Sequence, residues 1–261
     1  MPTVGELTGP YANFMLGPRA GPDVCSTCFN FTNGYERCYG CAHGEAWLDA
    51  VAPISYSVAH EQLHHALAGY KRLSGDVARR LRAELAAVLW RFLAEHEACV
   101  ARAAGAAMGA FKLVTTVPSG ERERERDHPL RLIVSELVGP TRDRHEHLLR
   151  RSGINVGARK FDAAKFEAVR KLASEPVLLV DDTWTTGANA QSAAAALRSA
   201  GAGPVGAVVI GRHLNRQWHE NDRRLRGIEA PFDWGQCALC AKRRAQGGGL
   251  CAGHRLPGDA P

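Results

Sequence analysis

A run of four apolar residues followed by two aspartates constrains the fold more than any other feature of the chain. Val177–Val180 contain no alternating polar residue, which predicts a strand buried on both faces. Asp181 and Asp182 follow at the carboxyl end of that strand, where open α/β sheets bind their ligands. Ala190–Ala200 then predict a helix, which Gly201 ends. This order predicts an α/β fold, with a mostly parallel central sheet flanked by helices.

The loop between this strand and helix is rich in small hydroxyl residues, including Thr183, Thr185 and Thr186. Such a loop offers hydroxyl donors, free backbone N–H groups and the positive end of a helix dipole, which together suit a phosphate. The preceding carboxylates can accept hydrogen bonds from sugar hydroxyls. The segment therefore predicts a ribose 5-phosphate pocket, although an Asp-Asp pair can also simply cap the next turn.

This segment resembles the 5-phosphoribosyl-1-pyrophosphate (PRPP) signature of type I phosphoribosyltransferases, which has an apolar strand, two acidic residues, two further residues and Thr-Thr-Gly. The resemblance implies that Asp181 and Asp182 are catalytic and hold the ribose 2- and 3-hydroxyls. It also implies that the 5-phosphate is bound by Thr183, Trp184, Thr185, Thr186, Gly187, Ala188 and Asn189. A receiver domain, which also carries paired aspartates, is excluded because the pair lies late in the chain.

A second candidate loop begins at the end of the β-rich run Phe111–Val117. In type I phosphoribosyltransferases the corresponding loop binds the pyrophosphate of PRPP, which implies a binding role for Thr116, Val117, Pro118 and Ser119. The alternating charges of Glu121–Asp127 are typical of a solvated helix start or a mobile loop. The alternative is that Arg122, Arg124 or Arg126 neutralises pyrophosphate.

Two cysteine pairs near the N-terminus have the spacing of a zinc site. Cys25 and Cys28 are followed, after nine residues, by Cys38 and Cys41. Two such turns can close a tetrahedron of thiolates around Zn²⁺, which would supply much of the folding energy of so small a module. The alternatives are unrelated thiol pairs or a redox Cys-x-x-Cys.

The C-terminal tail repeats this pattern and predicts a second zinc site, formed by Cys237, Cys240, Cys251 and His254. The glycine-rich tail could instead be disordered, or one pair from each end of the chain could share a metal. Cys99 is expected to belong to neither cluster and to be a buried thiol in a helix.

Between these ends, Val51–Tyr56 predict a strand and His60–Leu73 a helix. A longer amphipathic helix is predicted from its apolar face, formed by Val77, Leu81, Leu85, Val88, Leu89 and Phe92. The arginines on its other faces, Arg79, Arg80, Arg82 and Arg91, are expected to be solvated. His60, His64 and His65 are expected to be surface or packing residues rather than metal ligands.

The composition of the chain indicates its size class and its expected cellular compartment. The 261 residues, 45% of them hydrophobic, can bury one good-sized core with small appendages. No apolar run is long enough for a membrane span or an export signal, and most cysteines have metal-ligand spacing. We therefore expect a cytoplasmic protein, whose net charge of +6 suits anionic ligands.

As a whole the chain resembles the ComF family of phosphoribosyltransferase-like proteins, which begin with a four-cysteine zinc module and end with a phosphoribosyltransferase core. The resemblance rests on the four N-terminal cysteines and Asp181–Gly187, while Arg122–Pro129 depart from the family's Arg-x-Arg-Gly-Phe-Asn run. The expected organisation is a zinc module (1–46), a helical segment (47–105), the core (106–214) and a basic tail (215–261).

The resemblance implies transfer of 5-phosphoribosyl from PRPP to an unidentified nucleophile, with Mg²⁺ and release of pyrophosphate, in a protein that also holds structural Zn²⁺. The alternative is a non-catalytic, nucleic-acid-associated module that retains the pocket. Single-stranded DNA would then contact a basic stretch containing Trp218, whose arginines are Arg212, Arg216, Arg223, Arg224 and Arg226. A solvated linker is the other interpretation of that stretch.

Overall fold

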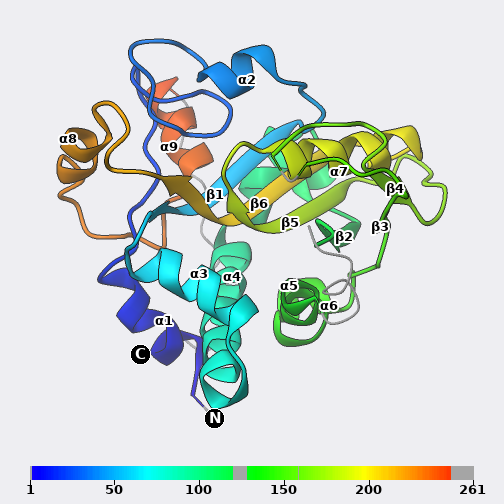
Figure 1. Cartoon of the computed structure of the whole chain (residues 1–261), viewed down its shortest axis with the longest axis horizontal. Coiled ribbons are helices and arrows are strands. Elements are labelled where there is room, and N and C mark those ends of the chain that lie inside the picture. The colour runs from blue at the N-terminus through cyan, green and yellow to red at the C-terminus, as the bar shows by residue number, and fades with distance from the viewer. Residues whose placement is uncertain (1, 120–127, 158, 248–261) are drawn as a thin grey trace.

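The computed structural model describes residues 2–119, 128–157 and 159–247. Its centre is a parallel sheet with the strand order β1-β6-β5-β2 (Figure 1). The four strands are β1 (Ala50–Val58), β2 (Leu113–Thr116), β5 (Val177–Trp184) and β6 (Val205–Leu214). A separate antiparallel pair is formed by β3 (Leu149–Arg151) and β4 (Phe166–Ala168). The predicted α/β fold with a mostly parallel sheet is confirmed.

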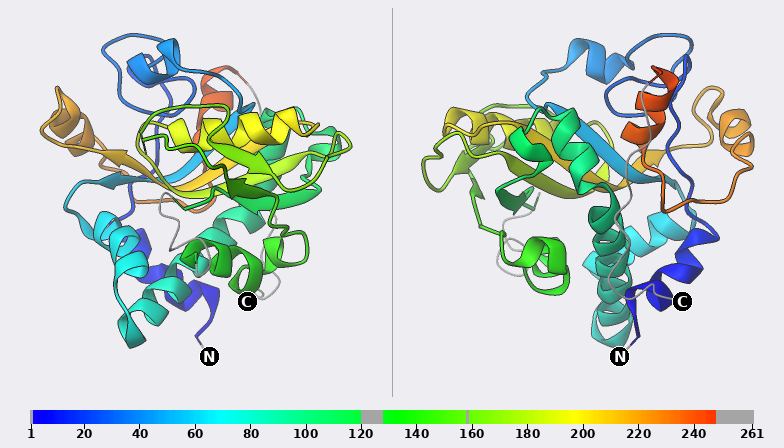
Figure 2. Two further views of the ribbon diagram at one scale, coloured as in Figure 1. Left: turned by 45° about the vertical axis from the view of Figure 1, so that its right-hand side comes forward. Right: turned by 180° about the vertical axis from the view of Figure 1, so that it is seen from behind.

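Helices cover both faces of this sheet (Figures 1 and 2). The longer ones are α1 (Val4–Ala12), α3 (Gln62–Arg72), α4 (Gly75–Ala103) and α7 (Ala188–Ser199). The shorter ones are α2 (Tyr39–His43), α5 (Pro129–Leu132), α6 (Gly139–Arg142), α8 (Asn221–Arg226) and α9 (Ala238–Ala245), with a 3-10 turn η1 (Ala107–Gly109) and a π turn η2 (Ile133–Leu137).

Alternate residues of β5 enter two different cores because successive strand side chains point to opposite faces. Leu178 and Val180 pack in the core that contains α3 and α4 residues, whereas Val177 and Leu179 pack in the core that contains α7 residues. All four are completely buried. The absence of polar residues from this run therefore has the predicted cause, a sheet covered on both faces.

The strand that carries the aspartates is longer than its apolar run. β2 pairs with Val177–Val180 only, but β5 continues beside β6 to Trp184. Asp181 and Asp182 therefore lie inside the strand rather than after it, which corrects the sequence expectation. The strand extends this far because β6 itself continues to Leu214 between β1 and β5, and supplies backbone partners there. Beyond Val180, the described residues give β5 a ladder partner on the β6 side only.

The two predicted helices before the core are present, with different details. α4 is longer than its predicted apolar face, and Val77 in its first turn is 57% exposed, so Val77 does not belong to the buried face. Arg79 and Arg80 are exposed as expected. Arg91 is only partly exposed, because it donates to Thr8 and lies 4.7 Å from the Trp234 ring. The N-terminal helix α1 and the chain near Trp234 together cover this side of α4.

Both ends of the expected core segment have close partners outside it. β1, from the predicted helical segment, pairs along its length with β6. In the basic tail, Leu225 of α8 packs with Phe31 and Tyr56 in a small third core. Within the described ranges, no helix is long and apolar enough to cross a membrane.

Candidate functional site

The two aspartates of β5 have different environments. Asp182 is 5% exposed, accepts a short hydrogen bond from the Tyr70 hydroxyl and forms an ion pair with Lys71. Both partners come from the last turns of α3, which lies against this face of the sheet. Sequence analysis did not select Tyr70 or Lys71, because nothing in a helical pattern shows which strand residue it will contact.

Asp181 is half-buried, and its Oδ1 accepts a 2.9 Å hydrogen bond from the Asp182 backbone N–H. Burial, with the adjacent Asp182 charge second, raises the pKa of Asp181 to about 7. Burial and the same Asp182 charge also raise the pKa of the Tyr70 hydroxyl well above its ordinary value. Asp182 is therefore held by a hydrogen bond and an ion pair, whereas Asp181 titrates near neutral pH.

The loop after β5 has the predicted strand–turn–helix form. Gly187 has φ +82° and stands at the N-cap of α7. A Cβ atom there would lie 2.1 Å from Cζ2 of Trp184, so both the backbone angle and the indole require glycine. Trp184 is 2% exposed, which makes its side chain a core residue beneath the loop rather than a ligand-facing one.

The hydroxyls of this loop remain near solvent. Thr185 and Thr186 are exposed, and Thr186 Oγ1 accepts a 3.3 Å hydrogen bond from the Ala188 backbone N–H. Asn189 Oδ1 is buried, and no hydrogen-bond donor reaches it among the described residues. The start of α7 therefore presents hydroxyls and helix N-terminal backbone beside the carboxylates, which is a chemically suitable set for an anionic sugar phosphate.

The second predicted loop adjoins the first. The Val117 backbone N–H donates to the Val180 carbonyl at 3.0 Å, next to Asp181. Thr116, Val117 and Pro118 are buried, whereas Ser119 is half-buried and its carbonyl accepts a hydrogen bond from Arg151. The side chains of the first three thus support the loop. Arg122, Arg124 and Arg126 lie outside the described residues.

The four N-terminal cysteines come together as predicted. Their sulfur atoms all lie within 4.8 Å of one another, and those of Cys28 and Cys38 are 3.7 Å apart. A tetrahedral Zn²⁺ with Zn–S bonds of about 2.3 Å places its sulfurs about 3.8 Å apart, so this group can hold structural zinc. His43 stacks on Tyr39 and is not part of the group. We call these four residues the N-terminal cluster.

A buried arginine joins the N-terminal cluster to the loop after β5. Arg212, on β6, is 5% exposed and donates to the carbonyls of Cys28, Trp184 and Thr185. Its Nη2 also lies 3.7 Å from the Cys28 sulfur. Sequence analysis placed Arg212 in a basic stretch, but the strand continues through it and its guanidinium cross-links two backbone segments.

Among the described residues, the C-terminal cysteines have partners that were not predicted from the sequence. Cys237 and Cys240 lie with His96 and Cys99 of α4, all four donor atoms being within 4.8 Å of one another. The expectation that Cys99 belongs to neither cluster is therefore wrong, although Cys99 is buried as predicted. Cys251 and His254 lie outside the described residues. We call His96, Cys99, Cys237 and Cys240 the second cluster.

A cavity of about 330 Å³ lies where the N-terminal cluster meets the loop after β5. Its lining includes Tyr39, His43, Arg159, Phe161 and Thr186. Gln191 of α7 also lines it and accepts hydrogen bonds from the backbone N–H groups of Trp47 and Leu48, which fixes the chain that leads out of the zinc module. The cavity combines aromatic, cationic and hydroxyl groups beside the loop after β5.

The basic stretch after β6 is an ordered part of the molecule rather than a solvated linker. Arg216 pairs with Glu61 and Asp222, Arg226 pairs with Asp222, and Arg223 pairs with Glu220. Arg224 lies over the Phe31 ring. Trp218 is 64% exposed. Nearby acidic groups thus neutralise much of the charge that single-stranded DNA would need.

No protein-family model matches this chain, and no curated protein matches it.

Proposed function

We propose that this chain binds PRPP at the carboxyl edge of β5 and transfers the 5-phosphoribosyl group to a nucleophile, as a pentosyltransferase. The observation that carries the proposal is the extension of β5 past β2, which leaves Asp181 and Asp182 beside the loop at the start of α7. Residues that would bind a ribose and residues that would bind its 5-phosphate are thus contiguous on one edge. The resemblance to the PRPP signature supports the same assignment.

In this proposal the loop Thr183–Asn189 binds the 5-phosphate, and Asp181 accepts hydrogen bonds from the ribose hydroxyls. Asp182 is already held by Tyr70 and Lys71, so its role in ribose binding requires that one of these contacts be exchanged. Lys71 would then be available to an anionic phosphate oxygen. Ionised Asp181 would also stabilise the positive charge that develops on the ribosyl ring as pyrophosphate leaves.

Mg²⁺, when bound with PRPP, would neutralise the pyrophosphate leaving group. The acidic pair is a suitable donor set for that ion, because carboxylate oxygens are the ligands Mg²⁺ prefers. The chain's own contribution is orientation of the ribose between the carboxylates and the phosphate loop. The 330 Å³ cavity beside Thr186 is the adjoining space for the acceptor.

The test is calorimetric titration of PRPP into the protein in the presence of Mg²⁺. We expect binding by the wild type, and at least about tenfold weaker binding by Asp181→Asn, since one charge-assisted hydrogen-bond acceptor is worth more than about 1.4 kcal/mol. Asp143→Asn is the matched control, because the Asp143 carboxylate is 84% exposed and pairs only with Arg142 among the described residues. Absence of binding by the folded wild type overturns the proposal.

Catalysis is tested separately, by release of pyrophosphate in a screen of nucleobase and amine acceptors. Release that depends on Asp181 supports the transferase. PRPP binding without release from any acceptor, combined with salt-sensitive binding of single-stranded DNA, favours the nucleic-acid-associated alternative.

A further inference from the structure

We propose that His96, Cys99, Cys237 and Cys240 bind a second structural Zn²⁺, which fastens α9 to α4. The residues come from two segments about 140 positions apart, so the Cys237-x-x-Cys240 spacing indicates two of the ligands but nothing in the sequence pairs them with His96 and Cys99. This inference is independent of the proposed function, because none of the four residues adjoins the carboxylate pair or its loops.

The donor atoms are arranged as a metal requires. The Cys240 sulfur lies 3.2 Å from that of Cys237 and 3.4 Å from that of Cys99. Nδ1 of His96 lies 4.0 Å from the sulfurs of both Cys99 and Cys240. Tetrahedral Zn²⁺ with bonds of about 2.0–2.3 Å separates its ligands by about 3.5–3.8 Å. Small adjustments of side-chain rotamers therefore suffice to complete the site.

His96 is oriented for ligation by its second ring nitrogen. Nε2 lies 2.6 Å from the Trp234 carbonyl oxygen, to which it can only donate. With its proton on Nε2, the imidazole presents the Nδ1 lone pair to the sulfurs. A ligating histidine commonly has such a carbonyl or carboxylate partner on its other nitrogen, because that bond fixes the tautomer and the ring orientation.

The surroundings favour a metal over a group of isolated thiols. The four side chains are between 1% and 6% exposed and form part of the core under the sheet. The Cys240 backbone N–H donates to the Cys237 sulfur, and Arg102 Nη2 lies 3.8 Å from the Cys99 sulfur. Three thiolates and one Zn²⁺ leave one negative charge, which Arg102 can offset. Cys240 forms a disulfide in this structure with neither Cys99 nor Cys237, which are free, so zinc binding requires that this bond first be reduced to give the Cys240 thiolate.

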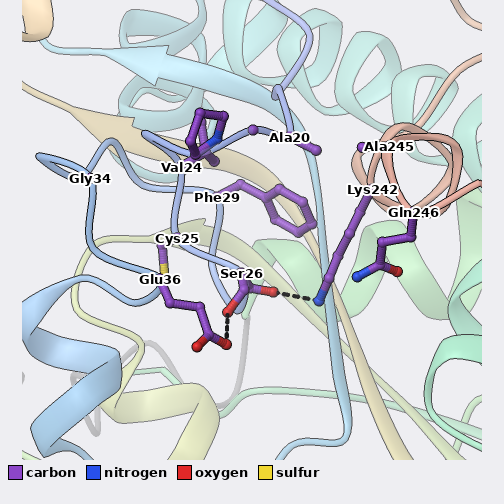
Figure 3. Close-up of a pocket in the computed structure, with 12 residues that line it drawn as sticks. Ala20, Val24, Cys25, Ser26, Phe29, Gly34, Glu36, Lys242, Ala245 and Gln246 are labelled. Carbon is purple, nitrogen blue, oxygen red and sulfur yellow. Dashed lines mark hydrogen bonds between the residues drawn. The ribbon is translucent and has the colours of Figure 1, made fainter.

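A metal here explains how α9 stays in place. α9 has only eight residues, and its buried members are Ala238 and Cys240, which is too little apolar surface for a stable helix. Leu239, which is only partly buried, also packs against the core, and Lys242 Nζ donates to the Ser26 carbonyl across a cavity of about 390 Å³ (Figure 3). Zinc ligation at the start of α9 would position Lys242 for that contact.

The experiment measures zinc per chain in protein purified with a phosphine reductant. We expect about two zinc ions in the wild type and about one in Cys99→Ser and in His96→Gln, because each variant removes a ligand from one site only. Cys251→Ser and His254→Ala are the matched controls and should keep both ions. A wild type with one ion overturns the proposal. So does loss of an ion in Cys251→Ser or His254→Ala, since the fourth donor is then not His96.

A second measurement uses the wild type alone, in case a variant fails to fold. Cys99 and Cys237 are alkylated before and after treatment with a strong chelator, and the labelled peptides are identified by mass spectrometry. We expect both to become reactive with the chelator and to be protected again by added Zn²⁺. Protection that does not change with chelator reflects burial alone and overturns the proposal.

Discussion

The N-terminal and second clusters use similar donors on opposite faces of one sheet. Cys25 and Cys28 pack in the core that contains α7 residues, whereas Cys99, Cys237 and Cys240 pack in the core that contains α4 residues. The N-terminal cluster draws all its donors from Cys25–Cys41, and the second draws them from segments that only folding brings together. A metal site whose ligands are all close in sequence can therefore be identified from the sequence. The full ligand set of a site assembled from distant segments cannot.

The clusters also differ in what holds their surroundings. The chain around the N-terminal cluster contains one short helix, α2, none of whose residues is buried. Two residues of the second cluster, His96 and Cys99, lie on α4, a helix of 29 residues with twelve buried positions. Loss of metal should therefore disorder the whole chain around the N-terminal cluster. At the second cluster it should detach α9 and leave α4 folded.

The largest expected effect tests this difference directly. After a strong chelator removes zinc, residues 24–44 should become the main site of limited proteolysis, while residues 75–103 stay protected. The N-terminal module should lose about 5 kcal/mol or more of its stability, since metal binding supplies most of the folding energy of such modules. Mass spectrometry of the fragments gives the cleavage positions. Equal protection of both regions after chelation would show that they do not differ in their structural dependence on metal.

A smaller effect is expected at the link between the N-terminal cluster and the loop after β5. Arg212→Met should lower the free energy of unfolding by about 2–4 kcal/mol, because it leaves the buried carbonyls of Cys28 and Trp184 without their donor. Denaturant unfolding at fixed zinc measures this change.

Arg223→Met is the matched control, since Arg223 is 77% exposed and pairs with Glu220 one turn away. Its expected effect is below about 0.5 kcal/mol. If the two arginine variants were equally stable, Arg212 would not act as the cross-link. If Arg212→Met also weakened zinc retention at the N-terminal cluster, Arg212 would contribute to metal binding as well as to stability.

The smallest effect concerns the carboxylate edge, which Arg212 links to the N-terminal cluster through the carbonyls of Trp184 and Cys28. The pKa of Asp181 rises from 3.8 to about 7 on folding, so the folded protein holds a proton that the unfolded chain has lost between these values. Stability should therefore fall as pH rises from about 4 through about 7, and then level off.

Asp181→Asn should remove that pH dependence and stabilise the protein at pH 8 by on the order of 2 kcal/mol. The measurement is thermal or denaturant unfolding of ligand-free protein across this pH range, with Asp143→Asn as the control for loss of one exposed carboxylate. An unchanged pH profile in Asp181→Asn would assign the slope to another group whose pKa is raised on folding, such as Glu95, whose pKa burial raises.

Elements with strong local signals were predictable from sequence. Val177–Val180 could be recognised as a doubly buried strand because no polar residue interrupts them, and Cys25–Cys41 could be recognised as a metal site because all four ligands lie within seventeen positions. Gly187 could be placed in the loop from its position in the Thr-Thr-Gly motif, and its positive φ agrees with that placement. These features depend on neighbours in sequence, so their physics is local.

The tertiary structure decided everything that depends on distant partners. Strand pairing carried β5 on through both aspartates, because β6 supplies ladder partners that the apolar run alone does not reveal. Packing of α3 against the sheet gave Asp182 its Tyr70 and Lys71 contacts, and burial in β6 turned Arg212 from a surface charge into a cross-link. Cys99 became a candidate metal ligand only because α9 docks beside α4. A sequence shows which donors and charges a chain possesses, but burial and proximity decide what they bind.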